Sequence, residues 1–196
     1  MKALTGLLGP LVAVNTLLLR AGRAVAWVFL GLMVVIILAQ IFFRYVIGDA
    51  LNWTEEAARF LMLWMCGLIA PSAYRWGGFV SIDMFVRALP ARVGAALGLA
   101  LLAVALSVLT SGIYYGWDHV TGFAGRFNSS TLRLPLDWVG GKAVKVRLAY
   151  MHASLFTCMI LMFLVNVEMM LKTAVSLFDP TVLHARDPDM IVAESD

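Results

Sequence analysis

The sequence has little charge. Asp, Glu, Lys and Arg make up 14% of its 196 residues, whereas 62% of the residues are hydrophobic. A soluble domain of this length carries about a quarter charged residues and about half apolar ones. The composition therefore excludes an ordinary soluble globular domain and predicts that much of the chain lies in a membrane.

Cysteines are few, and catalytic motifs are missing. The two cysteines, Cys66 and Cys158, fall in separate apolar runs, without the Cys-x-x-Cys spacing of a redox or zinc site. We find no phosphate-binding loop and no nucleophile–base pair in a supporting context. We therefore predict no enzyme, no metal site and no cofactor. The small net charge of +3, with basic residues near the ends of apolar runs, predicts contact with lipid headgroups and not with nucleic acid.

Long apolar runs are what the sequence has in abundance. Three of them, residues 24–43, 93–117 and 148–167, contain no Asp, Glu, Lys or Arg, and a fourth, residues 57–74, contains only Arg59. Each run is long enough to cross a hydrocarbon layer of ~30 Å at ~1.5 Å per residue. We predict an all-α integral membrane protein with four transmembrane helices at residues 24–43, 55–74, 93–117 and 148–171.

The segment before the first span, residues 1–23, needs a separate interpretation. It begins with a lysine and an apolar run, as a signal peptide does, but no small-x-small cleavage site precedes Arg20 and Arg23. Its leucines recur on one helical face, which favours an interfacial helix that lies on the membrane. An uncleaved partial span is the alternative.

Basic residues at the N-terminus give the predicted orientation. Lys2, Arg20 and Arg23 precede the first span, whereas acidic residues such as Asp49 follow it. The positive-inside rule then places the N-terminus in the cytoplasm. Four spans place the polar tail, residues 172–196, on the same side. The basic cluster at residues 142–147 belongs to the loop at residues 118–147, which this orientation places on the opposite side. The positive-inside rule would place such a cluster in the cytoplasm, so the cluster is an objection to this orientation.

Charge gathers at the start of the second predicted span, in the stretch "NWTEEAARF". We predict that Thr54 is the N-cap and that Glu55 and Glu56 meet the positive end of the helix dipole. Glu55 and Arg59 have the spacing of a helix-surface ion pair, and Trp53 suits the membrane interface. These residues could simply cap a helix. They could also hold a second polypeptide, because ionisable groups within a membrane usually face protein.

An amphipathic segment follows the second span. Arg75, Gly77 and Gly78 form a helix end that permits a sharp turn. We predict an amphipathic surface helix at residues 79–89, between helices two and three, that lies flat at the cytoplasmic face of the lipid bilayer. An ordinary amphipathic linker without a partner is the alternative. The apolar face consists of Phe79, Ile82, Phe85, Val86 and Leu89.

An ordered set of short motifs resembles the small membrane subunit of tripartite ATP-independent periplasmic (TRAP) transporters. In chain order the motifs are "FFRYV", "WTEEAARF", "AYRWGG", "SIDMF" and "STLRLP". The resemblance covers most of residues 24–135. This chain departs from the family pattern where "GGKAVKVRLAY" precedes the last span in place of a tyrosine and a second proline. The residues that match the family motifs are Arg44, Tyr45, Trp53, Thr54, Glu55, Glu56, Arg59, Arg75, Gly77, Gly78 and Asp83.

The resemblance implies a function in the bacterial inner membrane. Such transporters import organic acids with a sodium gradient: a periplasmic substrate-binding protein captures the substrate, and a large elevator-type membrane subunit moves it. The small subunit resembles a non-transporting brace beside the large subunit. The resemblance therefore implies two partners, the large membrane subunit and, during delivery, the substrate-binding protein. It also gives the eleven matching residues a structural or partner-binding role.

Two other classes of function remain open from the residues alone. His119 and His152 lie toward the same side of the membrane on neighbouring spans, as the haem ligands of a small b-type cytochrome would. Glu168, near the end of the last span, is the one carboxylate that a self-contained four-helix transporter could use.

Overall fold

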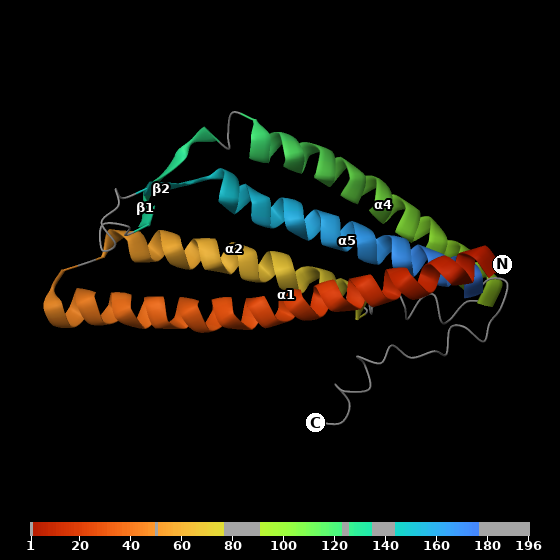
Figure 1. Cartoon of the computed structure of the whole chain (residues 1–196), viewed down its shortest axis with the longest axis horizontal. Coiled ribbons are helices and arrows are strands. Elements are labelled where there is room, and N and C mark those ends of the chain that lie inside the picture. The colour runs from red at the N-terminus through yellow and green to blue at the C-terminus, as the bar shows by residue number, and fades with distance from the viewer. Residues whose placement is uncertain (1, 50, 77–90, 123–125, 135–143, 177–196) are drawn as a thin grey trace, which may run out of the picture. The chain divides into compact units, whose positions relative to one another are not determined.

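The computed structural model describes residues 2–49, 51–76, 91–122, 126–134 and 144–176. Most of these residues are helical, and a two-stranded sheet lies between the last two helices in the sequence (Figure 1). The elements in chain order are α1 (Lys2–Phe42), a π-helix (Phe43–Ile47), α2 (Asn52–Arg75), α4 (Ala91–Thr121), β1 (Asn128–Leu134), β2 (Val144–Arg147) and α5 (Ala149–Ser176).

Four helical segments are long and apolar enough to cross a membrane. Each one extends a predicted span by several residues, and the fold class, an all-α membrane protein with four spans, is confirmed. The chain is therefore a multi-pass membrane protein. The segments are Leu8–Ile47, Trp53–Arg75, Val93–Thr121 and Ala149–Val175.

The first helix differs from the expected segmentation. We expected a separate element at residues 1–23, but α1 runs without a break from Lys2 to Phe42. Alanine, leucine and arginine, which are good helix formers, surround Gly22 at the junction, and no proline interrupts it. The placement of residues 1–23 at the membrane surface stays a prediction. The helical path ends at Gly48, whose φ of 78° is a left-handed conformation that glycine adopts without strain.

Several predicted features lie outside the described residues. The amphipathic helix at residues 79–89 is one of them, together with Gly77, Gly78 and Asp83. The polar tail is described only as far as Ser176, where α5 ends. These predictions therefore remain as they were made from the sequence.

The loop predicted at residues 118–147 contains an antiparallel pair of strands. In the register of Cα positions, Asn128 lies opposite Arg147 and Leu134 lies opposite Val144, with an irregularity between. The pairing continues past β2, because the Leu148 N–H donates to the Phe127 carbonyl at 2.9 Å. These strands were not predictable from the sequence, since runs of four and seven residues give little alternation of apolar and polar residues to recognise.

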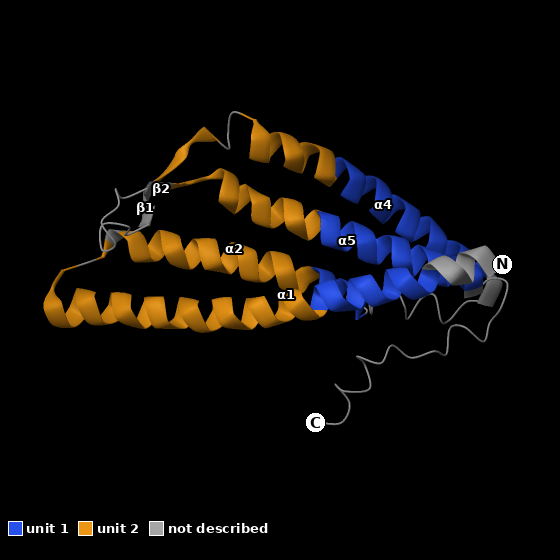
Figure 2. Cartoon of the chain, viewed as in Figure 1, with its two compact units in different colours: residues 1–19, 71–111, 160–196 blue, residues 20–70, 112–159 orange. Residues whose placement is uncertain are grey.

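The chain divides into two compact units, and each of the four helices contributes to both (Figure 2). Unit 1 consists of residues 1–19, 71–111 and 160–196, and unit 2 consists of residues 20–70 and 112–159. The buried core of unit 1 is formed by Leu19, Tyr74 and Val165, with Met162 and Met169 packed against it.

Unit 2 is held by close helix contacts at glycines. A Cβ atom added at Gly67 of α2 would lie 2.8 Å from the Ser154 carbonyl oxygen of α5. A Cβ added at Gly116 of α4 would lie 3.1 Å from the Phe156 ring. The small residues thus let α2 and α4 approach α5 closely, as small residues do between membrane helices.

Candidate functional site

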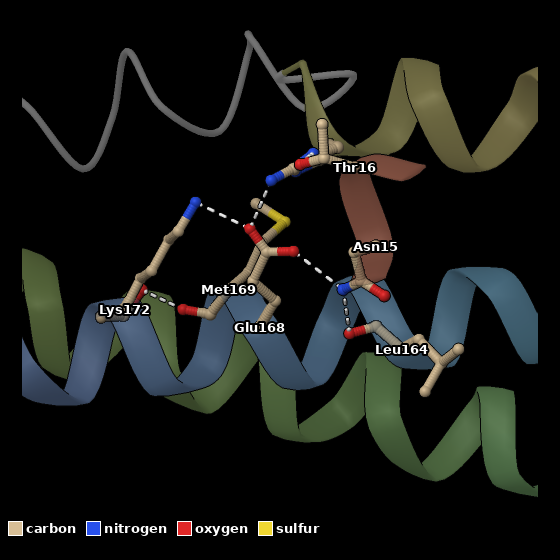
Figure 3. A network of polar contacts seen from close by, with 8 residues as sticks. Asn15, Thr16, Leu164, Glu168, Met169 and Lys172 are labelled. Atoms are coloured by element: carbon tan, nitrogen blue, oxygen red, sulfur yellow. Dashed lines mark hydrogen bonds and ion pairs between the residues drawn. The ribbon is translucent and has the colours of Figure 1, made fainter. Parts of the chain in front are cut away.

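Unit 1 contains a buried cluster of charged and polar side chains centred on Glu168 of α5 (Figure 3). The Glu168 side chain is 0% exposed. Its Oε1 atom accepts from Arg75 Nη2 at 2.9 Å and pairs with Lys172 Nζ at 2.7 Å. Its Oε2 atom accepts from Asn15 Nδ2 at 2.8 Å. Both carboxylate oxygens therefore have partners, and two of the three partner groups carry positive charge.

The cluster joins three helices. Asn15 of α1 also donates to the Leu164 carbonyl of α5 at 3.1 Å (Figure 3). Arg75 Nη1, at the end of α2, donates to Thr16 Oγ1 of α1 at 2.9 Å. Asn15 is 1% exposed and the Arg75 side chain is 3% exposed. The first part of α1, the end of α2 and the second half of α5 are thus connected through buried polar groups.

A buried carboxylate is very costly unless charges and hydrogen bonds compensate it. Here one amide and two cationic groups contact the two carboxylate oxygens and supply that compensation. Removing one partner from such a pair typically costs 3–5 kcal/mol, because the remaining charge stays buried. We call this set the Glu168 cluster; its members are Asn15, Thr16, Arg75, Glu168 and Lys172.

Arg75 is the one member of the Glu168 cluster that the sequence motifs indicated; the structural roles of the others were not predicted. Glu168 had been considered only as a transport carboxylate. The available signal was the presence of Asn15 and Glu168 within apolar runs, since polar groups inside a membrane usually have partners. The partners themselves lie far away in sequence, 93 residues in the case of Arg75 and Glu168.

The second group of candidate residues is the charged helix start, which we define as Trp53, Thr54, Glu55, Glu56 and Arg59 at the beginning of α2. Arg59 and Glu55 form the predicted i,i+4 ion pair, and their side chains are 70% and 64% exposed. Glu56 is half-buried and Trp53 is exposed. The pair therefore lies on the outer surface of unit 2, where it is available to another molecule.

The N-cap prediction for Thr54 is wrong. The helix begins at Asn52, two residues earlier, so Thr54 lies in the first turn. Its Oγ1 hydroxyl donates to the Leu51 carbonyl at 2.7 Å and does not cap a backbone N–H. A threonine hydroxyl in a helix commonly donates a hydrogen bond to a backbone carbonyl of the preceding turn in this way. Thr54 is 0% exposed, which makes it part of the packing of unit 2.

The predicted residues Arg44 and Tyr45 lie in the π-helix that follows α1. The Arg44 guanidinium carbon is 5.9 Å from the centre of the Tyr45 ring, within cation–π range. Tyr45 is 77% exposed. Both residues and the charged helix start belong to unit 2, whereas Arg75 belongs to unit 1. The predicted site residues are therefore divided between the two units.

The two histidines considered as haem ligands do contact each other. The His119 and His152 ring centres are 6.0 Å apart in an edge-to-face arrangement, and His119 Nδ1 is 2.9 Å from the Tyr115 carbonyl oxygen. Within the described part of the chain, no group of three or more His, Cys, Asp or Glu residues is arranged to hold a metal ion. An edge-to-face contact of this kind is also ordinary packing between aromatic rings.

Comparison with known proteins identifies a family that matches most of the chain. The family described as "Tripartite ATP-independent periplasmic transporters, DctQ component" matches residues 33–175. This range includes the charged helix start, the β-strands and most of the Glu168 cluster. No match was found among curated proteins.

Proposed function

Because the chain belongs to the family of DctQ components of tripartite ATP-independent periplasmic transporters, we propose that it is a non-transporting brace for the large membrane subunit. The transporter would import an organic acid and couple this import to a sodium gradient. In this proposal the chain is a transporter component and not an enzyme. The family match is the main support for the proposal. The geometry of the Glu168 cluster favours a bracing role over a transporting one.

The Glu168 cluster is built like a structural contact. A carboxylate that carries an ion or proton needs access to water or to an exchangeable ligand. Glu168 is 0% exposed, and both of its oxygens are engaged by side chains of the same chain. Its most direct role is to fix α1, α2 and α5 to one another in unit 1. This rigidity suits a subunit that holds still while another moves.

The charged helix start is the proposed contact with the large membrane subunit. Its Glu55–Arg59 pair is exposed, and α1 adds exposed apolar side chains in the same unit, such as Trp27 (72%) and Val35 (62%). An exposed pair contributes little to the fold of its own chain, about 0.3–0.5 kcal/mol. Its charges are therefore free to serve recognition at low cost in stability.

The remaining parts of the proposal concern the location and the other partner. We place the chain in the bacterial inner membrane with both termini in the cytoplasm, so that the charged helix start faces the periplasm. The periplasmic substrate-binding protein would then approach the same side during delivery. Choice of substrate would belong to that protein and to the large subunit.

A purification tests the proposal. The tagged chain is extracted in a mild detergent from cells that produce all transporter components. We expect a much larger polytopic membrane protein to co-purify in fixed ratio, and we expect an Arg59→Glu variant to retain less of it than an Arg59→Gln variant. A chain that purifies alone under these conditions would contradict the proposed partnership.

A further inference from the structure

Two exposed arginines, Arg126 and Arg147, lie at the same end of the β-strand pair. We call this end the ribbon base and define it as residues 126–128 and 147–150. Backbone pairing brings its two halves together, because Asn128 lies opposite Arg147 and Leu148 bonds to Phe127. Arg126 directly precedes this pairing, and Arg147 is part of it. The ribbon base lies wholly within unit 2.

These two arginines differ from others in the chain. Arg59 is paired with Glu55, Arg75 with Glu168, and Arg44 with the Tyr45 ring. Arg126 and Arg147 are both exposed, and neither forms an ion pair or hydrogen bond with its side chain in the structure as described. Their positive charge is therefore not neutralised there.

The rest of the ribbon adds positive charge. In the Cα register, Arg133 lies opposite Lys145. Residues 126–147 contain a single acidic residue, Asp137. The basic residues of the same stretch are Arg126, Arg133, Lys142, Lys145 and Arg147. This excess of basic residues in the sequence favours contact with an anion from outside the chain.

The ribbon base contains two exposed aromatic side chains, and a third lies near the end of α4. Trp117 near the end of α4 is 57% exposed, Phe127 is 53% exposed and Tyr150 at the start of α5 is 57% exposed. Tryptophan and tyrosine concentrate where a membrane protein crosses the headgroup layer. The arginines stand a few residues from the ends of two spans, since Thr121 ends α4 and Ala149 begins α5. They are therefore within reach of lipid phosphates.

We propose that the ribbon base binds the headgroups of anionic phospholipids, with Arg126 and Arg147 as the phosphate-binding residues. A guanidinium presents paired donors that match the oxygens of a phosphate. The flanking aromatic residues favour a lipid over an acidic protein surface, because their apolar parts enter the bilayer while the arginines meet the phosphates. This surface does not depend on the large subunit, so it is tested separately from the proposed function.

The test uses the full chain, stripped of lipid in detergent and titrated with phosphatidylglycerol or phosphatidylcholine. Native mass spectrometry counts the lipids retained. We expect the chain to prefer phosphatidylglycerol. Each basic residue near an anionic surface contributes about fivefold in affinity, so the double variant Arg126→Gln/Arg147→Gln should bind phosphatidylglycerol roughly 25-fold more weakly. Arg59→Gln, which removes an exposed arginine that has a carboxylate partner, is the matched control and should bind normally.

Three results would overturn the proposal. The first is equal binding of the two lipids by the unmodified chain, and the second is unchanged phosphatidylglycerol binding by a folded double variant. The third is a double variant that keeps lipid but no longer binds the soluble component of the transporter, which would make the ribbon base a protein-docking surface. If the double variant does not fold, the test is the effect of added salt on lipid binding by the unmodified chain. Salt screens the arginine charges, so it should lower the amount of phosphatidylglycerol retained and leave the amount of phosphatidylcholine unchanged.

Discussion

At the scale of single residues, Glu168 and Arg59 show two different uses of charge in a membrane protein. Glu168 is fully buried and bonded to side chains from α1, α2 and α5. Arg59 lies on the surface and pairs with Glu55 one turn away. The first charge holds the chain together, because the Arg75 guanidinium would otherwise be buried without its carboxylate partner. The second can be lost at little cost to the fold and is therefore suited to recognition.

The buried charge gives a prediction for stability. Glu168→Leu leaves the buried Arg75 guanidinium without its carboxylate partner, and we expect the free energy of unfolding to fall by about 3–5 kcal/mol. Unfolding of the purified chain in mixed micelles, followed by circular dichroism, measures the change. The double variant Glu168→Leu/Arg75→Leu should lose less than the single variant, because no lone charge stays buried. A single-variant loss below about 1 kcal/mol would mean that the cluster is not a structural contact.

The surface charges give a prediction for transport. Arg59→Glu places a second carboxylate one turn from Glu55, and Glu56→Lys reverses a half-buried charge. We expect both reversals to lower substrate uptake by the assembled transporter and to leave substrate capture by the isolated soluble component unchanged. Glu55→Gln should have a mild effect, because an exposed i,i+4 pair is worth about 0.3–0.5 kcal/mol. If both charge-reversal variants took up substrate as fast as the unmodified transporter, the charged helix start would only stabilise the beginning of α2 and would not contact a partner.

At the scale of elements, glycines set how closely the helices of unit 2 pack. We expect Gly67→Ala to lower the free energy of unfolding by about 1–3 kcal/mol, the usual cost of forcing extra volume into a packed contact. The added methyl group would lie 2.8 Å from the Ser154 carbonyl oxygen, which is backbone and cannot turn aside. Gly31→Ala is the matched control, since nothing lies within 4 Å of its Cβ position. Equal unfolding free energies for the two variants would show that α2 and α5 are not in close contact there.

The elements also show how far sequence reasoning reaches. Four spans were predictable because each apolar run exceeds the length that a membrane requires. Their ends were less predictable, as the start of α2 at Asn52 shows, because helix ends depend on local hydrogen bonds that several residues could supply. The continuity of α1 through Arg20 and Arg23 was missed, because these charges suggested a boundary although they are compatible with a helix.

The candidate sites were predictable to different degrees. The Glu55–Arg59 pair follows from a spacing of four residues on one helix, so the sequence was enough. The Glu168 cluster requires knowing that α1, α2 and α5 meet, and Asn15 and Glu168 are separated by 153 residues. A single sequence contains no information on such a pairing beyond the cost of leaving polar groups alone in an apolar region.

At the scale of the whole molecule, orientation in the membrane is the first property to test. The basic residues before the first span and the acidic residues after it predict that both termini are cytoplasmic. Reporter fusions at the C-terminus should be active with a cytoplasmic reporter and inactive with a periplasmic one. A fusion at residue 140 should give the opposite result. If both fusions gave the opposite results, the ribbon would lie on the cytoplasmic side. The positive-inside rule, applied to the basic residues of the ribbon alone, favours that side.

The central claim is that this chain supports transport without performing it. Proteoliposomes test this claim with the large membrane subunit alone, this chain alone, or both together, each supplied with substrate-loaded soluble component and an inward sodium gradient. Uptake of labelled substrate is the measurement. The account predicts uptake only when both membrane subunits are present. Uptake by this chain alone, or undiminished uptake by the large subunit without it, would contradict the account.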